Sequence, residues 1–248
     1  IQAMAPFDII FDEHLKDLSK YRVLVLADQE CLSEVQMDLI RNFVERGGAV
    51  VATEQTSLYT TRRLRRADFG LKDLFNVSAP QWHGPGAVEK NLEIAPVRTR
   101  VGRGRVVYTP SVQAAIEKPR AERMSSRYWK LPVNWKDLIE GVKWAAGGRL
   151  SLEVIAPGTL TVVAELMDQL GKNRRLVHLV NYTGPQGKTV SNVRVAVELP
   201  QGRQAGEITL LTPDGGESHK VPGRVEQGRV HFTVPRLDTY TMAVLDLV

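Results

Sequence analysis

Three short polar segments hold the residues best suited to chemistry. Each follows a predicted strand, and the side chains in question are Asp12, Glu13, His14, Asp28, Glu30, Cys31, Glu54, Thr56 and Ser57. Carboxylates, imidazoles and thiols can serve as general acids, general bases or nucleophiles. In open α/β sheets, ligands bind outside the carboxyl ends of the strands. We therefore expect these residues to gather along one edge of a sheet, as the rim of a ligand site or an interface.

The sharpest chemistry that this set allows is a Cys–His–Glu hydrolase of the glutamine amidotransferase kind. That chemistry needs the cysteine on a tight strand-to-helix turn, usually between glycines, where backbone N–H groups stabilise negative charge. Cys31 instead lies between Glu30 and Leu32, and an acidic neighbour disfavours a reactive thiolate. We interpret Cys31 as a half-buried structural residue.

Neither a serine nucleophile nor a metal site is indicated. Ser57 lacks the G-x-S-x-G frame, and a serine after a strand is most often a helix cap. The five histidines form no H-x₃-H or H-E-x-x-H pair, and the single cysteine rules out a multi-cysteine zinc site. VGRGRV precedes a strand, which disfavours a phosphate loop. The sequence predicts no catalytic residue, no metal and no cofactor.

A dense basic run lies in TTRRLRRADF, where the four arginines are Arg62, Arg63, Arg65 and Arg66. The formal net charge is +5, but no aromatic residue interleaves with these arginines, so we expect no nucleic-acid binding. We interpret the run as a solvated face, with docking of an acidic partner as the alternative. Trp82 and Trp129 lie in predicted loops, and they either pack those loops onto the domain or anchor an interface.

Strand-like and helix-like runs alternate over residues 1–148. Short apolar runs at 7–11, 21–27 and 49–53 predict buried strands, and VRTRVGRGRVVYTP predicts a hairpin. One helix begins after Ser33 with a capping box and ends before Gly47, and others are predicted around 65–78 and 135–148. The first helix has an apolar face at helical spacing, made of Val35, Leu39, Ile40, Phe43 and Val44. This order predicts a mostly parallel sheet.

Residues 149–248 follow a different period. About seven short strands separated by turn signals such as TGPQG and TPDGG predict an antiparallel β-sandwich. Apolar residues alternate with polar or small ones in several of these strands, and the alternating sets are Val193, Val195, Val197 and Leu199, then Val230, Phe232 and Val234, then Tyr240, Met242 and Val244. The only aromatic residues here are Tyr182, Phe232 and Tyr240, and the last two belong to alternating patterns that we expect to face the core. This disfavours a carbohydrate-binding module that stacks sugars on rings.

The bulk composition is that of an ordinary globular protein, with 43% hydrophobic and 25% charged residues. No stretch approaches the roughly 18 apolar residues that would span a bilayer, and no signal peptide opens the chain. We expect a soluble protein, with the cytoplasm favoured and with export of a longer parent left open. Only about 148 residues alternate, which is too few for a (β/α)₈ barrel.

The segments APFDIIFDEHL, YRVLVLADQECLSEVQMDLIRNFVERGGAVVATEQTSLY and DFGLKDLFNVS together resemble the β-galactosidase trimerisation domain. That domain follows the catalytic barrel in family 42 glycoside hydrolases. VGRGRVVYTP and WKDLIEGVKWAAG resemble its later strand and closing helix, and the tail from RRLVHLVNYTG onward is similar to the C-terminal β-sandwich of such enzymes. The resemblance covers nearly the whole chain.

This resemblance implies a flavodoxin-like, class-I-amidotransferase-like domain that lacks the amidotransferase cysteine and whose first strand is missing here. It implies a non-catalytic role in oligomerisation, as a trimer or a dimer, and in shaping the mouth of the parent protein's N-terminal catalytic barrel. The family's catalytic glutamates belong to that barrel, so none transfers to this sequence. The alternatives are a stand-alone amidotransferase-like enzyme or ligand-binding protein, and an interaction module that docks acidic partners through the arginine run.

Overall fold

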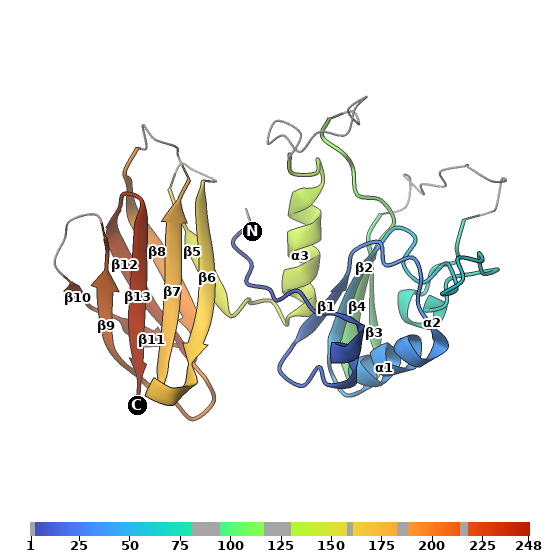
Figure 1. The fold of residues 1–248 in the computed structure, drawn as a ribbon, viewed down its shortest axis with the longest axis horizontal. Coiled ribbons are helices and arrows are strands. Elements are labelled where there is room, and N and C mark those ends of the chain that lie inside the picture. The colour runs from blue at the N-terminus through green and yellow to red at the C-terminus, as the bar shows by residue number, and fades with distance from the viewer. Residues whose placement is uncertain (1–2, 81–94, 117–129, 158–160, 183–187, 214–217) are drawn as a thin grey trace. The chain divides into compact units, whose positions relative to one another are not determined.

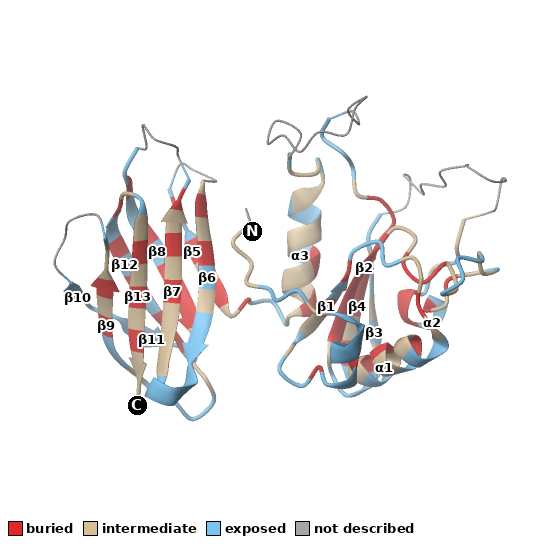
Figure 2. Cartoon of the chain, viewed as in Figure 1, coloured by how far each residue is buried: buried red, intermediate tan, exposed pale blue. Residues whose placement is uncertain are grey.

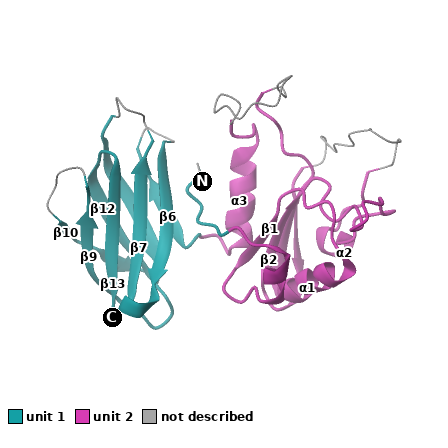
Figure 3. Cartoon of the chain, viewed as in Figure 1, with its two compact units in different colours: residues 1–8, 150–248 teal, residues 9–149 magenta. Residues whose placement is uncertain are grey.

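The computed structural model describes residues 3–80, 95–116, 130–157, 161–182, 188–213 and 218–248 (Figure 1). The chain divides into two compact units (Figure 3). One unit, called the α/β unit below, is Ile9–Arg149. The other, called the sandwich unit, joins Ile1–Asp8 to Leu150–Val248. Trp82 and Trp129 lie outside the described residues.

The α/β unit is built on a four-stranded sheet in the order β1-β2-β4-β3. Its strands are β1 (Val23–Leu26), β2 (Ala49–Thr53), β3 (Val97–Val101) and β4 (Gly104–Thr109). β1, β2 and β4 are parallel, and β3 joins β4 in an antiparallel hairpin. Every residue of β2 is buried, as the continuous apolar run AVVAT predicts for a strand covered on both faces (Figure 2). The predicted parallel sheet and hairpin are confirmed.

Among the described residues, three α-helices accompany this sheet: α1 (Glu34–Glu45), α2 (Lys72–Phe75) and α3 (Trp135–Ala145). Ser33 caps α1 with Gln36 in a capping box, as predicted. Gly104 of β4 lies so close to α1 that an added Cβ would be 2.2 Å from the carbonyl oxygen of Val44, so this position requires glycine. The buried face of α1 includes Met37, whereas Val35 is 69% exposed, so the predicted apolar face was wrong at Val35.

The strand predicted over residues 7–11 is wrong. These residues have no regular secondary structure, and the 3₁₀ helix η1 (Asp12–Lys16) follows them. Phe7, Ile9 and Phe11 are 58%, 78% and 66% exposed. Apolar residues at alternate positions of this segment suit a strand. A strand forms only when it is hydrogen-bonded to a neighbouring strand, and the described residues provide no such neighbour for this segment.

The sandwich unit contains two antiparallel sheets. The five-stranded sheet has the order β10-β9-β13-β7-β6, and its strands are β6 (Val162–Gln169), β7 (Arg174–Asn181), β9 (Ala205–Leu211), β10 (His219–Val221) and β13 (Tyr240–Leu247). The four-stranded sheet has the order β11-β12-β8-β5, and its strands are β5 (Leu152–Ile155), β8 (Val190–Glu198), β11 (Arg224–Glu226) and β12 (Arg229–Leu237). A 3₁₀ turn, η3 (Leu170–Lys172), joins β6 to β7.

A single apolar core fills the space between these two sheets (Figure 2). The predicted core faces of β8 and β12 are confirmed, since Val193, Val195, Val197, Val230, Phe232 and Val234 are all buried. The prediction for β13 was wrong. Its core residues are Thr241, Ala243 and Leu245, whereas Tyr240, Met242 and Val244 face the other way and remain partly exposed. Both faces of this strand carry apolar residues, so the alternating pattern fits either face as the buried one. A shift of one residue in the assignment exchanges the buried and the exposed face.

Candidate strand-end site

The candidate site lies at the carboxyl ends of β1 and β2 in the α/β unit. The turn Glu54–Ser57 follows β2, and the segment Ala27–Glu30 follows β1. The Glu54 N–H donates to the Thr109 carbonyl at the end of β4 (3.0 Å), which ties this turn to the next parallel strand. The second and third of the predicted polar segments are therefore brought together at one edge of the sheet.

Hydrogen bonds between side chains and backbone groups join the end of β2 and its turn to the segment after β1. The Asp28 N–H donates to Thr53 Oγ1 (2.9 Å), and Asp28 Oδ1 accepts from the Gln55 N–H (2.9 Å). Thr56 Oγ1 accepts from the Gln29 N–H (3.2 Å) and lies 2.7 Å from the Thr53 carbonyl oxygen, to which its hydroxyl donates. The hydroxyl of Thr56 is fully used by backbone groups of this edge.

Ser57 also has a structural partner. Its side chain is fully buried, and Ser57 Oγ accepts a hydrogen bond from the Leu71 N–H (3.1 Å) just before α2. Buried hydroxyls that satisfy backbone donors stabilise a turn, whereas a nucleophile must face substrate. Among the described residues, no histidine contacts Ser57. Ser57 therefore has a structural contact, but it is not the N-cap of a helix, because no helix begins directly after it and the N-cap of α2 is Leu71.

Three residues of this edge hold left-handed backbone conformations that are uncommon outside glycine. The φ angles are 51° for Asp28, 50° for Glu54 and 66° for Ser57. Such conformations cost about 1 kcal/mol or more each and persist where the surroundings fix them. The hydrogen bonds of Asp28 and Ser57 supply that constraint. Both turns are thereby held in one shape.

Tyr108 completes the edge and was not singled out from the sequence. Its hydroxyl donates to the carbonyl oxygen of Glu54 (2.6 Å), and its ring stacks on Phe75 with centroids 4.9 Å apart. Burial raises the pKa of Tyr108 well above its usual value, and the negative charges of Glu54 and Asp28 raise it further. Tyr108 is therefore a neutral hydrogen-bond donor at physiological pH. In the sequence, the one feature that could have indicated Tyr108 as a residue of this site is its place near the end of a predicted strand.

The first predicted segment does not join this edge. Asp12, Glu13 and His14 lie on the exposed helix η1. Nδ1 of His14 accepts from the Phe11 N–H of its own turn (3.1 Å). No hydrogen bond or ion pair links these three residues to Asp28, Glu30 or Glu54 within the described structure. The reason is that residues 7–11 form no strand. A strand there would have placed the three residues at the edge of the sheet.

Most of the arginine run binds neighbouring protein atoms. Arg63 pairs with Glu30 (2.6 Å), and Arg65 donates to the carbonyl oxygen of Pro80 (2.6 Å). Arg66 pairs with Glu34 at the start of α1 (2.7 Å) and donates to the Leu32 carbonyl (3.1 Å). Arg62 is exposed. Because three of these arginines hold the segment 60–66 in place, the run is less available for docking than its charge suggests.

This edge offers no recognisable catalytic constellation. Cys31 pairs as an isolated bridge with Tyr59 and is only partly exposed, and no hydrogen bond joins it to His14. No group of three or more metal-binding side chains occurs in the described parts of the chain. The edge also carries two carboxylates, Asp28 and Glu54, whose negative charges act on Tyr108. That arrangement can accept hydrogen bonds from a polar ligand or from a neighbouring polypeptide.

Comparison with known proteins gives a likeness of fold. No family model matches the sequence, and no curated protein matches it. Alpha-L-fucosidase isoenzyme 2 from Paenibacillus thiaminolyticus is similar over 100% of this chain, with a TM-score of 0.60 and 16% identity.

Within the described residues, no helix combines the length and the apolar character that a membrane span requires.

Two beta-galactosidases are also similar in structure. Gan42B, a GH42 beta-galactosidase from G. stearothermophilus, has a TM-score of 0.57 and 15% identity over 98% of this chain. The beta-galactosidase from Bacillus circulans sp. alkalophilus has a TM-score of 0.55 and 14% identity over 92% of this chain. This chain spans 44% of the fucosidase chain and 34% of each beta-galactosidase chain. The chain therefore has the fold of a part of larger glycoside hydrolases.

Proposed function

We propose that this chain is a non-catalytic portion of a glycoside hydrolase of the β-galactosidase kind. The observation that carries the proposal is the extent of the fold likeness. It runs through both units of this chain, yet it accounts for less than half of each glycoside hydrolase chain. The remainder of such a parent would hold the catalytic barrel. The α/β unit would be of the amidotransferase-like, trimerisation-domain type.

In this proposal the α/β unit associates subunits, as a trimer or a dimer, and shapes the mouth of a catalytic barrel, while the sandwich unit braces it. Two features of the strand-end edge support a scaffolding role. The hydroxyls of Thr56 and Ser57 are buried and bound to backbone groups. Asp28, Glu54 and Ser57 keep constrained conformations that give the rim a fixed shape.

The direct test is an assay of the purified chain with chromogenic galactosides. We expect no turnover above background. As a matched control, Asp28→Asn and Glu54→Gln should leave that background unchanged, since neither carboxylate is a catalytic residue in this proposal. Turnover that falls in either variant would overturn it. Sedimentation velocity on the same samples tests the association role, for which a dimer or trimer is expected.

A second candidate is a small-molecule enzyme or ligand-binding protein with an amidotransferase-like fold. The cluster of left-handed residues favours it, because backbone strain concentrates at functional sites. Glutamine hydrolysis is its measurable consequence, with Cys31→Ala as the informative variant. Hydrolysis that disappears in Cys31→Ala would support this candidate, whereas the first proposal expects no hydrolysis in either protein.

A further inference from the structure

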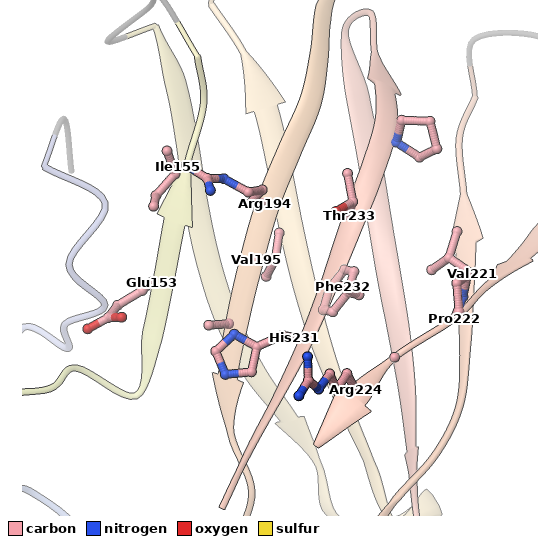
Figure 4. Close-up of a pocket in the computed structure, with 13 residues that line it drawn as sticks. Glu153, Ile155, Arg194, Val195, Val221, Pro222, Arg224, His231, Phe232 and Thr233 are labelled. Atoms are coloured by element: carbon pink, nitrogen blue, oxygen red, sulfur yellow. The ribbon is translucent and has the colours of Figure 1, made fainter. Parts of the chain in front are cut away.

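A groove of about 690 Å³ crosses the outer face of the four-stranded sheet in the sandwich unit (Figure 4). Its floor is made by β5, β8 and β12, and its wall is the segment Val221–Arg224 that leads into β11. The groove lies within one unit and outside the candidate site of the α/β unit. Its volume falls in the usual range for small-molecule sites.

Strand register places seven side chains of this groove in two rows across the sheet. One row is Glu153, Ala196, His231 and Arg224, and the other is Ile155, Arg194 and Thr233. Directly opposed residues lie about 5 Å apart, so their side chains line a continuous surface. Ala196 is the smallest member, and it leaves a hollow in the floor between Glu153 and His231.

The groove carries an excess of positive charge. Arg194 stands on β8 of the floor, and Arg224 stands at the start of β11 in the wall (Figure 4). Arg224 pairs with Glu226 at the exposed edge (2.6 Å), whereas no ion pair of Arg194 occurs in the described parts of the chain. Glu153 does not cancel this charge, because Arg229 approaches it at 3.6 Å.

Arg229 is itself an unusual feature of this face. Its side chain is 6% exposed and donates to the Ala196 carbonyl oxygen beneath the groove floor (2.9 Å). Its Nε has no hydrogen-bond partner in the described structure. The buried guanidinium is bonded to the Ala196 carbonyl and lies in ion-pair range of Glu153, whose carboxylate oxygens can accept hydrogen bonds. The floor is thereby built to present both donors and acceptors.

We propose that this groove binds an acidic oligosaccharide. The planar guanidinium groups of Arg194 and Arg224 match carboxylates, which accept two parallel N–H bonds. Glu153, His231 and Thr233 can bind sugar hydroxyls. An extended acidic peptide fits less well, because peptides usually add to a free sheet edge, whereas this groove runs across the strands. The choice of a saccharide rests on the proposed glycoside hydrolase function, while the anionic character rests on the groove.

The test is isothermal titration of the complete chain with trigalacturonate at physiological salt. We expect saturable binding, and no binding of the neutral galactotriose. The paired substitution Arg194→Gln and Arg224→Gln should weaken binding by at least about tenfold, the loss expected from removing charge-assisted hydrogen bonds. The matched control is Lys172→Gln with Arg203→Gln, which removes the same charge from exposed turns of the same unit and should leave the affinity unchanged.

Three results would overturn the proposal. They are no binding of trigalacturonate, equal weakening by both paired substitutions, and equally tight binding of triglutamate or inorganic phosphate. Equal weakening would show attraction by net charge alone, and equally tight triglutamate or phosphate would show a general anion site. The outcome is separable from the galactosidase assay, which depends on neither arginine. Turnover by this chain would overturn the proposed function and leave the titration result intact.

Discussion

At the scale of single residues, two hydroxyl groups determine the shape of the strand-end edge. Thr56 binds backbone groups of both strand ends, and the Tyr108 hydroxyl donates to the carbonyl oxygen of Glu54. Each interaction supports a residue whose backbone is left-handed or adjacent to one. A hydroxyl in this setting contributes through the buried partners it satisfies.

Thr56→Val tests this role because valine keeps the shape and removes the hydroxyl. We expect the free energy of unfolding of the α/β unit to fall by about 1–3 kcal/mol, since the Gln29 N–H loses its acceptor and the Thr53 carbonyl oxygen keeps only the Thr56 N–H as a donor. Urea unfolding followed by tryptophan fluorescence reports on this unit, because all four tryptophans precede residue 149. The exposed control Thr61→Val should stay within about 0.5 kcal/mol of the wild type.

Tyr108→Phe tests the pH dependence of the same edge. The pKa of Tyr108 is raised in the folded state, so the fold keeps the proton after the unfolded chain releases it. Stability from this group is therefore complete below the ordinary tyrosine pKa of about 10 and falls as pH rises above it. We expect Tyr108→Phe to be less stable at neutral pH but to lose less stability above pH of about 10. Parallel curves for the two proteins over that range would contradict this.

At the scale of elements, the arginine-rich segment 60–66 is bound to neighbouring parts of the α/β unit. Arg66 joins the segment 60–66 to the first turn of α1, and its side chain is 20% exposed. Exposed ion pairs contribute little, but this guanidinium also satisfies the Leu32 carbonyl. These contacts of Arg66 hold the loop that leads into α2.

Arg66→Gln should remove these contacts and make the segment 60–66 less stable locally. We expect amide hydrogen exchange in residues 58–66 to become about fivefold faster, the change that about 1 kcal/mol of lost local stability produces. Mass spectrometry of peptides from this segment measures it. Arg62→Gln removes the same charge from an exposed position and should leave exchange unchanged. Equal acceleration in both variants would show that the contacts of Arg66 are irrelevant.

At the scale of the whole molecule, each unit has its own apolar core. The sequence places a domain boundary at 148–149, and contacts in the structure divide the chain at Arg149–Leu150, with residues 1–8 joining the sandwich unit. Met4 packs against the sandwich core, which gives that N-terminal segment a physical link to it.

The fragment 150–248 tests whether the sandwich unit folds alone. We expect a single cooperative transition in far-ultraviolet circular dichroism on heating, because the core between the two sheets lies almost entirely within this fragment. Adding residues 1–8 by a short linker should raise the midpoint, since Met4 then regains its contacts. A fragment without a cooperative transition would contradict the independence of this unit.

The sequence by itself determined the elements whose evidence is local. The α1 cap at Ser33, the buried run of β2, the β3–β4 hairpin and the core faces of β8 and β12 all follow from spacing and turn chemistry. These features depend on neighbours along the chain, so the pattern carries them. The expectation that Ser57 is structural came from the same local reasoning.

Only the tertiary structure decided features that depend on distant partners. Residues 7–11 alternate like a strand yet form none, because pairing needs a neighbour that the described residues do not supply. The core face of β13 was set by packing between sheets, and the sequence allowed either face. Tyr108 reached Glu54, and Arg194 aligned with Thr233, through strand register. Such contacts join residues far apart in sequence, so no local pattern could reveal them.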